Sequence, residues 1–243
     1  MRFKNFWSIL LSILISVGFA VSTTTVFAKD GKSNNSRERV QQPINLAVLV
    51  QDDVISQVGN ELGVTRDFIR KLPQGSRVMV AYITAGSLQV RVPFTSDLDK
   101  ASKSLRIPIA SASSAPFNPY VELIDALKKF DSSWNHANAV LLVSDGLDIS
   151  RGFDSTAAGH TLDLDRAITE ANKKRVAVFS FYAPTVGLTN HSSLAASYGQ
   201  SSLNRLAHET GGKAFFQGTN GFVTFDSYFD RLTEAFNRQY ASR

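Results

Sequence analysis

Acidic side chains that directly follow apolar runs are the residues of this chain best placed for chemistry. Asp52 and Asp53 come after the run Ile44–Val50, and Asp145 follows the run 139–144. Carboxylates at the ends of neighbouring parallel strands can converge, and a site of oxygen ligands alone suits Mg²⁺, Mn²⁺ or Ca²⁺. Aspartates at strand ends are more often simple turn formers or caps. Both interpretations stay open on residue chemistry alone.

Other catalytic templates do not occur in the sequence. It contains no G-x-S-x-G, G-x-x-x-x-G-K-[ST], G-x-G-x-x-G or H-E-x-x-H motif. It has no cysteine, which excludes disulfides, thiolate metal sites and cysteine nucleophiles. A metal-assisted hydrolase that uses Asp52, Asp53 and Asp145 remains an alternative, but no nucleophile or general base stands out. We therefore expect a protein that is not an enzyme.

The elements that must position these acids follow from the apolar pattern. Short apolar runs, typical of strands buried on both faces, alternate with runs of helical spacing. The predicted strands are 44–50, 77–84, 88–94, 139–144, 176–182 and 213–217, and the predicted helices are 54–72, 98–105, 119–130, 162–174, 202–210 and 225–240. Alternation and Pro93 in the third strand favour an antiparallel edge position. The sequence predicts an α/β fold with a doubly wound, mostly parallel sheet, one antiparallel edge strand, and helices on both faces.

The N-terminal residues have the pattern of a secretory signal peptide. Arg2 and Lys4 precede an apolar stretch at 6–21, and the small residue Ala28 favours cleavage directly after it. An uncleaved membrane anchor is the alternative, although the stretch is short for a span of about 20 residues. We expect residues 1–28 to be a signal peptide, and the protein to be exported to the periplasm or the extracellular space.

The rest of the chain is predicted to be a polar, disordered linker at 29–42 and a single domain at 43–243. Of the 243 residues, 43% are hydrophobic, which is ordinary for a globular protein. The net charge is +5, but the basic residues form no clustered face, so we expect no nucleic-acid partner. Nor do we expect a membrane partner beyond a possible N-terminal anchor. The expected binding face consists of four loops after the strands, at 51–56, 111–118, 145–160 and 183–200.

Several motifs together resemble those of a known family. They are the acids Asp52-Asp53 at a strand end, the segment LLVSDGLD at 141–148, YGQSSLNRLAHETGGKAFFQG at 198–218 and FDSYFDRLTEAFNRQY at 225–240. In this order they resemble a von Willebrand factor type A (vWA) domain, in particular the VWFA-related domain of secreted bacterial proteins. The similarity covers nearly all of 43–240, and it implies the Rossmann-like vWA fold.

The resemblance also implies a metal-ion-dependent adhesion site, built from a D-x-S-x-S motif, a distant threonine and a distant aspartate. The motif falls on Asp52, Val54 and Ser56, and the distant aspartate on Asp145. Val54 offers no oxygen where the family has serine, and the segment expected to hold the threonine has none. The resemblance therefore implies a degenerate site, with Asp52, Ser56 and Asp145 as metal ligands and Mg²⁺ or another divalent cation as the ion.

Only Ser114 or Asn118 could replace the threonine of that site. By resemblance, we expect a binding module whose partner is another protein and whose action is protein–protein interaction. A structural envelope protein with a vestigial metal site is a further alternative, because the same fold can serve several functions.

Overall fold

The computed structural model describes residues 40–131, 137–152, 161–216, 218 and 224–240. The predicted signal peptide 1–28 and most of the predicted linker lie outside the described residues. Val40, which the sequence assigned to the linker, is buried against the core, and the backbone N–H of Gln41 donates to the side chain of Asn237. The folded unit therefore includes residues that we had placed in the linker.

The described residues contain a six-stranded sheet with the order β3-β2-β1-β4-β5-β6. All neighbouring strands are parallel except β2 and β3, which are antiparallel. The strands are β1 (Ile44–Gln51), β2 (Arg77–Thr84), β3 (Ser87–Thr95), β4 (Ala137–Ser144), β5 (Val176–Tyr182) and β6 (Ala214–Phe215). This confirms the predicted fold class, including the antiparallel edge strand.

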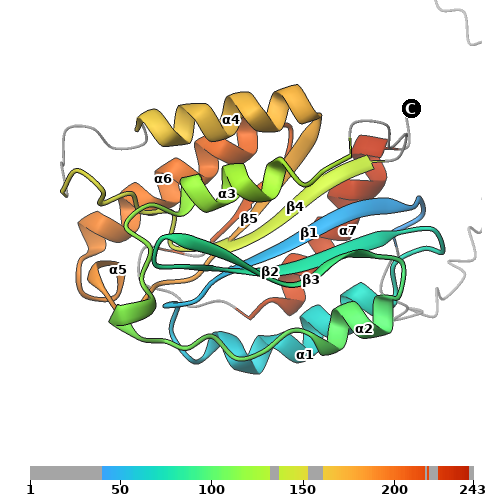
Figure 1. Ribbon diagram of the computed structural model, residues 1–243, viewed down its shortest axis with the longest axis horizontal. Coiled ribbons are helices and arrows are strands. Elements are labelled where there is room, and N and C mark those ends of the chain that lie inside the picture. Colours follow the sequence, from blue (N-terminus) through green and yellow to red (C-terminus); the bar gives the residue numbers. More distant parts are fainter. Residues whose placement is uncertain (1–39, 132–136, 153–160, 217, 219–223, 241–243) are drawn as a thin grey trace, which may run out of the picture. The chain divides into compact units, whose positions relative to one another are not determined.

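Helices cover both faces of the sheet (Figure 1). The helices are α1 (Val58–Arg70), α2 (Leu98–Lys103), α3 (Pro119–Leu127), α4 (Leu162–Lys174), α5 (Leu188–His191), α6 (Ser193–Glu209) and α7 (Asp226–Tyr240), and η1 (Ala112–Ser114) is a 3₁₀ turn. One core layer lies between the sheet and α1, α2 and α7, and the other lies between the sheet and α3, α4 and α6. Side chains of β1 alternate between these two layers, as a central strand requires.

Local sequence explains most element boundaries. Asn118 caps α3 by accepting a hydrogen bond from the Tyr120 N–H, and Pro119 occupies the first helical position. Thr161 caps α4 in the same way. Edge strand β3 contains Pro93 and is mostly exposed, which fits a strand with one unpaired side.

Two local predictions are wrong. The segment 183–200 was predicted to be a long loop, but it holds α5 and the first two turns of α6. The hydroxyl of Ser192 caps α6 by accepting a hydrogen bond from the Ala195 N–H, and the short alanine-rich run that follows is buried. A polar composition thus concealed a helix whose small residues allow close packing. The last strand is also shorter than predicted, because only Ala214 and Phe215 pair with β5.

Candidate functional site

Five chain segments meet at the carboxyl ends of the central strands. Backbone hydrogen bonds join Ala110 to Asp52, Val186 to Asp53, Ile55 to Pro184, and Ile149 to Phe117. The loops after β1, β4 and β5 and the loops before η1 and α3 therefore form one connected surface. It lies where a doubly wound sheet places its ligands.

Asp52, at the end of β1, is fully buried and forms an ion pair with Arg106. The guanidinium Nη1 lies 2.6 Å from Oδ1 and Nη2 lies 2.7 Å from Oδ2, so both carboxylate oxygens are engaged. Oδ1 also accepts a hydrogen bond of 3.0 Å from the Ile109 N–H. This bidentate geometry is the strongest form of a charged hydrogen bond in proteins. The bond to Asp52 raises the pKa of Arg106, although burial opposes the shift.

Arg106 is itself held in place from three sides. Its guanidinium carbon lies 3.9 Å from the centre of the Tyr82 ring, a distance typical of a cation–π contact. The Tyr82 hydroxyl accepts a hydrogen bond from the Arg106 N–H and donates one to the Arg106 carbonyl. Nη1 also donates to the carbonyl of Ile107. Arg106 is therefore a fixed part of the site.

Asp145, at the end of β4, is compensated by neutral donors. Its Oδ2 accepts a hydrogen bond of 3.0 Å from the Thr189 hydroxyl, and its Oδ1 accepts one of 3.2 Å from the Leu147 N–H. Burial raises the pKa of Asp145, and these hydrogen bonds partly offset the shift. Gly199 of α6 fits closely here, since a Cβ on it would overlap the Asp145 carbonyl oxygen. The end of β4 is thus fixed by packing against α6.

Asp53 is the acidic neighbour of Asp145. The Ser144 hydroxyl donates a hydrogen bond to the side-chain oxygen Oε1 of Gln51, and Nε2 of the same Gln51 amide donates to Asp53 Oδ1 over 2.9 Å. Burial, and after it the negative charge of Asp145, raise the pKa of Asp53 to about 7. Near neutral pH, Asp53 therefore carries a proton for part of the time.

The predicted metal ligands have different surroundings. Asp52 binds Arg106, whereas Asp145 has Asp53 and Thr189 as neighbours. Ser56 is exposed, and its carbonyl accepts a hydrogen bond from the N–H of Gly59 at the start of α1. Among the described residues, no group of three or more acidic, histidine or cysteine side chains is arranged to hold a metal ion.

The two residues considered as replacements for the family threonine have other roles. Asn118 caps α3 and donates a hydrogen bond to Asp163, and Ser114 donates to the Ser111 carbonyl in η1. Thr189 of α5 is the hydroxyl that reaches Asp145 instead. Sequence reasoning missed it because α5 was predicted to be loop.

Arg106 was also missed, because an arginine more than fifty residues away along the chain gives no spacing signal for a contact with Asp52. The loop sequence that follows it does give a signal. Ile107 and Ile109 are apolar residues in a predicted loop, and both are largely exposed, at 61% and 58%. Exposed apolar side chains in a loop indicate an interaction surface rather than a core.

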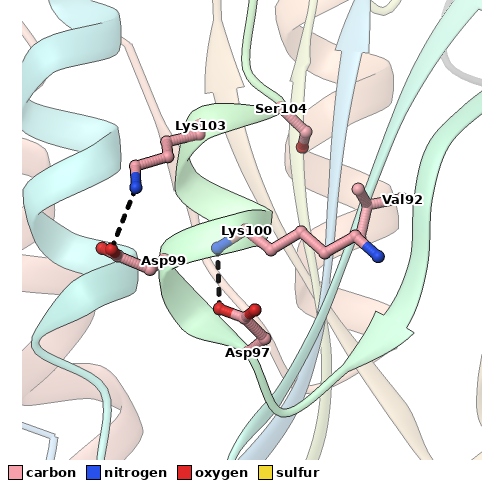
Figure 2. Close-up of a pocket in the computed structure, with 6 residues that line it drawn as sticks. All are labelled: Val92, Asp97, Asp99, Lys100, Lys103 and Ser104. Carbon is pink, nitrogen blue, oxygen red and sulfur yellow. Dashed lines mark hydrogen bonds and ion pairs between the residues drawn. The ribbon is translucent and has the colours of Figure 1, made fainter.

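An open depression between α2 and β3 is a separate feature (Figure 2). It is lined by Val92, Asp97, Asp99, Lys100, Lys103 and Ser104. Asp99 forms an ion pair with Lys103, and Asp97 caps α2 through the Lys100 N–H. Both acids are satisfied by groups of α2, and no predicted site residue lines the depression, so we assign it no function.

No family model matches this chain, and no curated protein is similar to it in sequence. Solved structures do match it. One is an aerotolerance-related membrane protein from Bacteroides fragilis NCTC 9343 with multiple mutations to serines. It is 14% identical to this chain with a TM-score of 0.52, and the match covers 81% of this chain and 100% of that protein chain. Another is the conserved hypothetical protein BatB from Bacteroides thetaiotaomicron. It is 13% identical to this chain with a TM-score of 0.56, and the match covers 84% of this chain and 100% of the BatB chain.

The VWA domain of SpRpn10 is 11% identical with a TM-score of 0.47, and the match covers 82% of this chain and 95% of that domain.

In the described part of the chain, no helix is both long and apolar enough to span a bilayer. The strand order, the antiparallel edge strand and the acids at the ends of β1 and β4 are the arrangement that the sequence resemblance implied. The chain has a Rossmann-like vWA fold.

Proposed function

We propose that this protein is an exported binding module that docks another protein on the surface at the carboxyl ends of its strands. The observation that supports the proposal most directly is the gathering of exposed apolar side chains on that surface. They are Ile107, Ile109 and Phe117 on the loops before α3, Leu188 on α5 and Leu194 at the start of α6. We call these five residues the apolar rim.

The loops and helices that carry the apolar rim also hold charges that are already compensated within the chain. Asp52 is paired with Arg106, and Asp145 is hydrogen-bonded to Thr189. The hydrophobic effect, rather than a strong charge at the centre, would therefore drive association. Phe117 is 70% exposed, the highest value among the large apolar side chains of the described residues, and aromatic anchors dominate the energetics of many interfaces. We expect a partner that offers an apolar surface.

The proposal assigns binding and no catalysis. The alternative, a metal-assisted hydrolase, would use Asp52 as one of three carboxylates, and both oxygens of Asp52 are engaged by Arg106. The two remaining carboxyls, Asp53 and Asp145, have raised pKa values, a property common at functional sites but also found in structural networks. No observation favours turnover over binding.

The docking surface can be tested by photo-crosslinking in the cells that make the protein. A photoreactive residue is placed at Ile109 or Phe117, and a control is placed at the exposed Lys173, in the last turn of α4. We expect an adduct with another protein from the two rim positions and none from Lys173. The partner is then purified, and its affinity is measured by calorimetry for the wild type, for the double variant Ile109→Ser, Phe117→Ser, and for the control Val90→Ser.

Loss of two anchoring side chains is expected to weaken binding at least about tenfold, while Val90→Ser leaves it unchanged. Val90 is a matched control because it is an exposed apolar residue on edge strand β3. Equal adducts from Lys173, or unchanged affinity of the double variant, would contradict the proposal. An adduct that holds only a second copy of this chain would replace it with a dimer interface.

The export part of the proposal has its own test. The protein is recovered from the cells that make it, and its N-terminus is sequenced. Cleavage by a signal peptidase after Ala28 predicts a mature chain that begins at Lys29 and is found outside the cytoplasm. A cytoplasmic protein that begins at Met1 would contradict export without affecting the docking surface.

A further inference from the structure

We propose that the guanidinium of Arg106 is a built-in cation that takes the place of a divalent ion at the end of β1, so that this position is closed to metal. The sequence resemblance implies an ion held by Asp52, Ser56 and Asp145. The residues as they lie in this structure do not fit such an ion. The inference is independent of the docking proposal, because it concerns ion binding and stability without a partner.

The first reason is that Asp52 has little ligating capacity left. Arg106 contacts both of its carboxylate oxygens, and the Ile109 N–H contacts one of them. A carboxylate has about four lone-pair positions, and three are used by donors of this chain. The side chain of Asp52 is 0% exposed, whereas that of Arg106 is 28% exposed. Of the two partners, only the arginine is in contact with solvent, so an ion has no open access to the carboxylate.

The second reason is that the other implied ligands do not lie around Asp52. Val54 is buried and pairs with Thr185 through a bridge between their backbones. Ser56 is exposed at the start of α1. Asp145 accepts hydrogen bonds from Thr189 and from the Leu147 N–H. Mg²⁺ and Ca²⁺ require six or more oxygen ligands, and replacing all of these with water would leave a weak site.

The third reason is that Arg106 cannot easily move aside. The Tyr82 ring lies against its guanidinium, and the Tyr82 hydroxyl holds both its backbone N–H and its carbonyl. Arg66 of α1 donates to the carbonyl of Leu105, which fixes the residue just before it. An ion at Asp52 would either displace this arrangement or lie beside a permanent positive charge that repels it.

The backbone of the loop after Arg106 also helps to hold Asp52 in place. Ala110 has a φ of 52°, in the left-handed region that an alanine seldom adopts. Its N–H donates to the carbonyl of Asp52, and the N–H of Ile109 donates to the Asp52 carboxylate. Asp52 thus binds a cation and two backbone N–H groups, all of them from one loop of the same chain.

Ion binding to the whole chain tests the inference. The protein is treated with chelator, and its thermal unfolding midpoint is measured with and without millimolar Mg²⁺, Mn²⁺ or Ca²⁺. We expect a shift below about 1 °C, because a ligand that does not bind the native state does not stabilise it. A rise of several degrees that disappears in Asp52→Asn would overturn the inference.

Removing the charge tests the role of the arginine. In Arg106→Gln, a buried carboxylate is left without its cation, so the midpoint is expected to fall by about 10 °C. The double variant Arg106→Gln, Asp52→Asn is expected to recover a large part of that loss, because the uncompensated charge is gone. An Arg106→Gln protein as stable as the wild type would overturn the inference.

A direct measurement keeps the inference testable if Arg106→Gln does not fold. Mn²⁺ binding to the wild type is followed by water-proton relaxation, with Asp52→Asn as the comparison. We expect the two proteins to give the same titration, whether it shows no binding or weak surface binding elsewhere. Binding by the wild type that Asp52→Asn removes would overturn the inference.

Discussion

The ends of β1 and β4 lie side by side in the sheet, and each is followed by a buried aspartate, yet the two carboxylates are compensated differently. Asp52 is paired with a full positive charge from Arg106. Asp145 has neutral donors such as Thr189 and the Leu147 N–H, and has Asp53 as an acidic neighbour. The comparison shows that the same residue type at equivalent strand ends can form a closed ion pair or a protonatable pair, depending on which loop reaches it.

The largest expected effect tests the ion pair. Asp52→Ala removes the buried partner of the ion pair and should lower the free energy of unfolding by about 4 kcal/mol, since the half-buried guanidinium of Arg106 loses its counter-ion and the Ile109 N–H loses its acceptor. In Asp145→Asn the amide oxygen still accepts from the Leu147 N–H, and the amide nitrogen can donate to the Thr189 hydroxyl, so the change should cost less than about 1 kcal/mol or stabilise the protein. Urea unfolding of both variants measures the difference. Equal losses would show that the two ends are compensated alike.

Gly199→Ala tests the packing that fixes the end of β4. The added methyl group would overlap the Asp145 carbonyl oxygen, so we expect a loss of about 3 kcal/mol as α6 is pushed away. Gly63→Ala is the matched control, because nothing lies within 4 Å of a Cβ at this exposed position of α1. The control should stabilise the protein by about 0.5 kcal/mol. A mild effect of Gly199→Ala on urea unfolding would mean that α6 does not hold Asp145.

Asp53, the second residue after β1, predicts a pH dependence of the stability. The pKa of Asp53 is raised from 3.8 to about 7, so the native state holds a proton that the unfolded state has released. The contribution of Asp53 to stability is therefore greatest below about pH 4, and it falls as the pH rises to about 7. Unfolding at several pH values measures the slope.

Asp53→Asn should remove the part of that slope that belongs to Asp53, because the amide cannot titrate, and the raised pKa of Asp145 leaves a smaller slope of the same sign. A wild-type slope that Asp53→Asn leaves unchanged would assign the dependence to other groups. The slope should persist in Asp99→Asn, since Asp99 is an exposed residue of α2 and its pKa is lowered by Lys103.

The smallest expected effect concerns the strained loop at Asp52. Ala110→Gly relieves a left-handed alanine but adds freedom to the unfolded chain, so the net gain is about 0.5 kcal/mol. Ala115→Gly is the control, because Ala115 has a φ of −63° and gains nothing from glycine. The control should lose about 0.5 kcal/mol. Urea unfolding that ranks the two variants in the opposite order would contradict strain at Ala110.

The sequence predicted the fold better than the site. Fully apolar runs such as 139–144 and the alternating run with Pro93 identify buried and edge strands because burial on one or both faces dictates residue type. The prediction of a loop at 183–200 was wrong because polar and small residues give no apolar pattern that indicates a helix. Here the helix is stabilised by packing, as the close approach of Gly199 to the Asp145 carbonyl oxygen shows. A tertiary contact here overrides a local pattern.

The acids were found from sequence, but their partners were not. Asp52, Asp53 and Asp145 follow apolar strands and are recognisable by position. Arg106 and Thr189 reach them from loops and a short helix, and chain spacing does not encode such contacts. The ligand set taken from the resemblance assumed that Asp52 and Asp145 share an ion, whereas the structure gives each its own partner.

The central place of β1 has a consequence for how the chain folds. Of the strands in the described residues it is the first to be synthesised, and its two neighbours are β2, which follows soon, and β4, which begins at Ala137. Until β4 has been made, one edge of β1 is unpaired, and unpaired edges of apolar strands favour association with other chains. Pairing between distant segments is slow, because the chain loses the entropy of loop closure before the stabilising contacts between the strands have formed. A newly made chain therefore depends on its second half to protect its first strand.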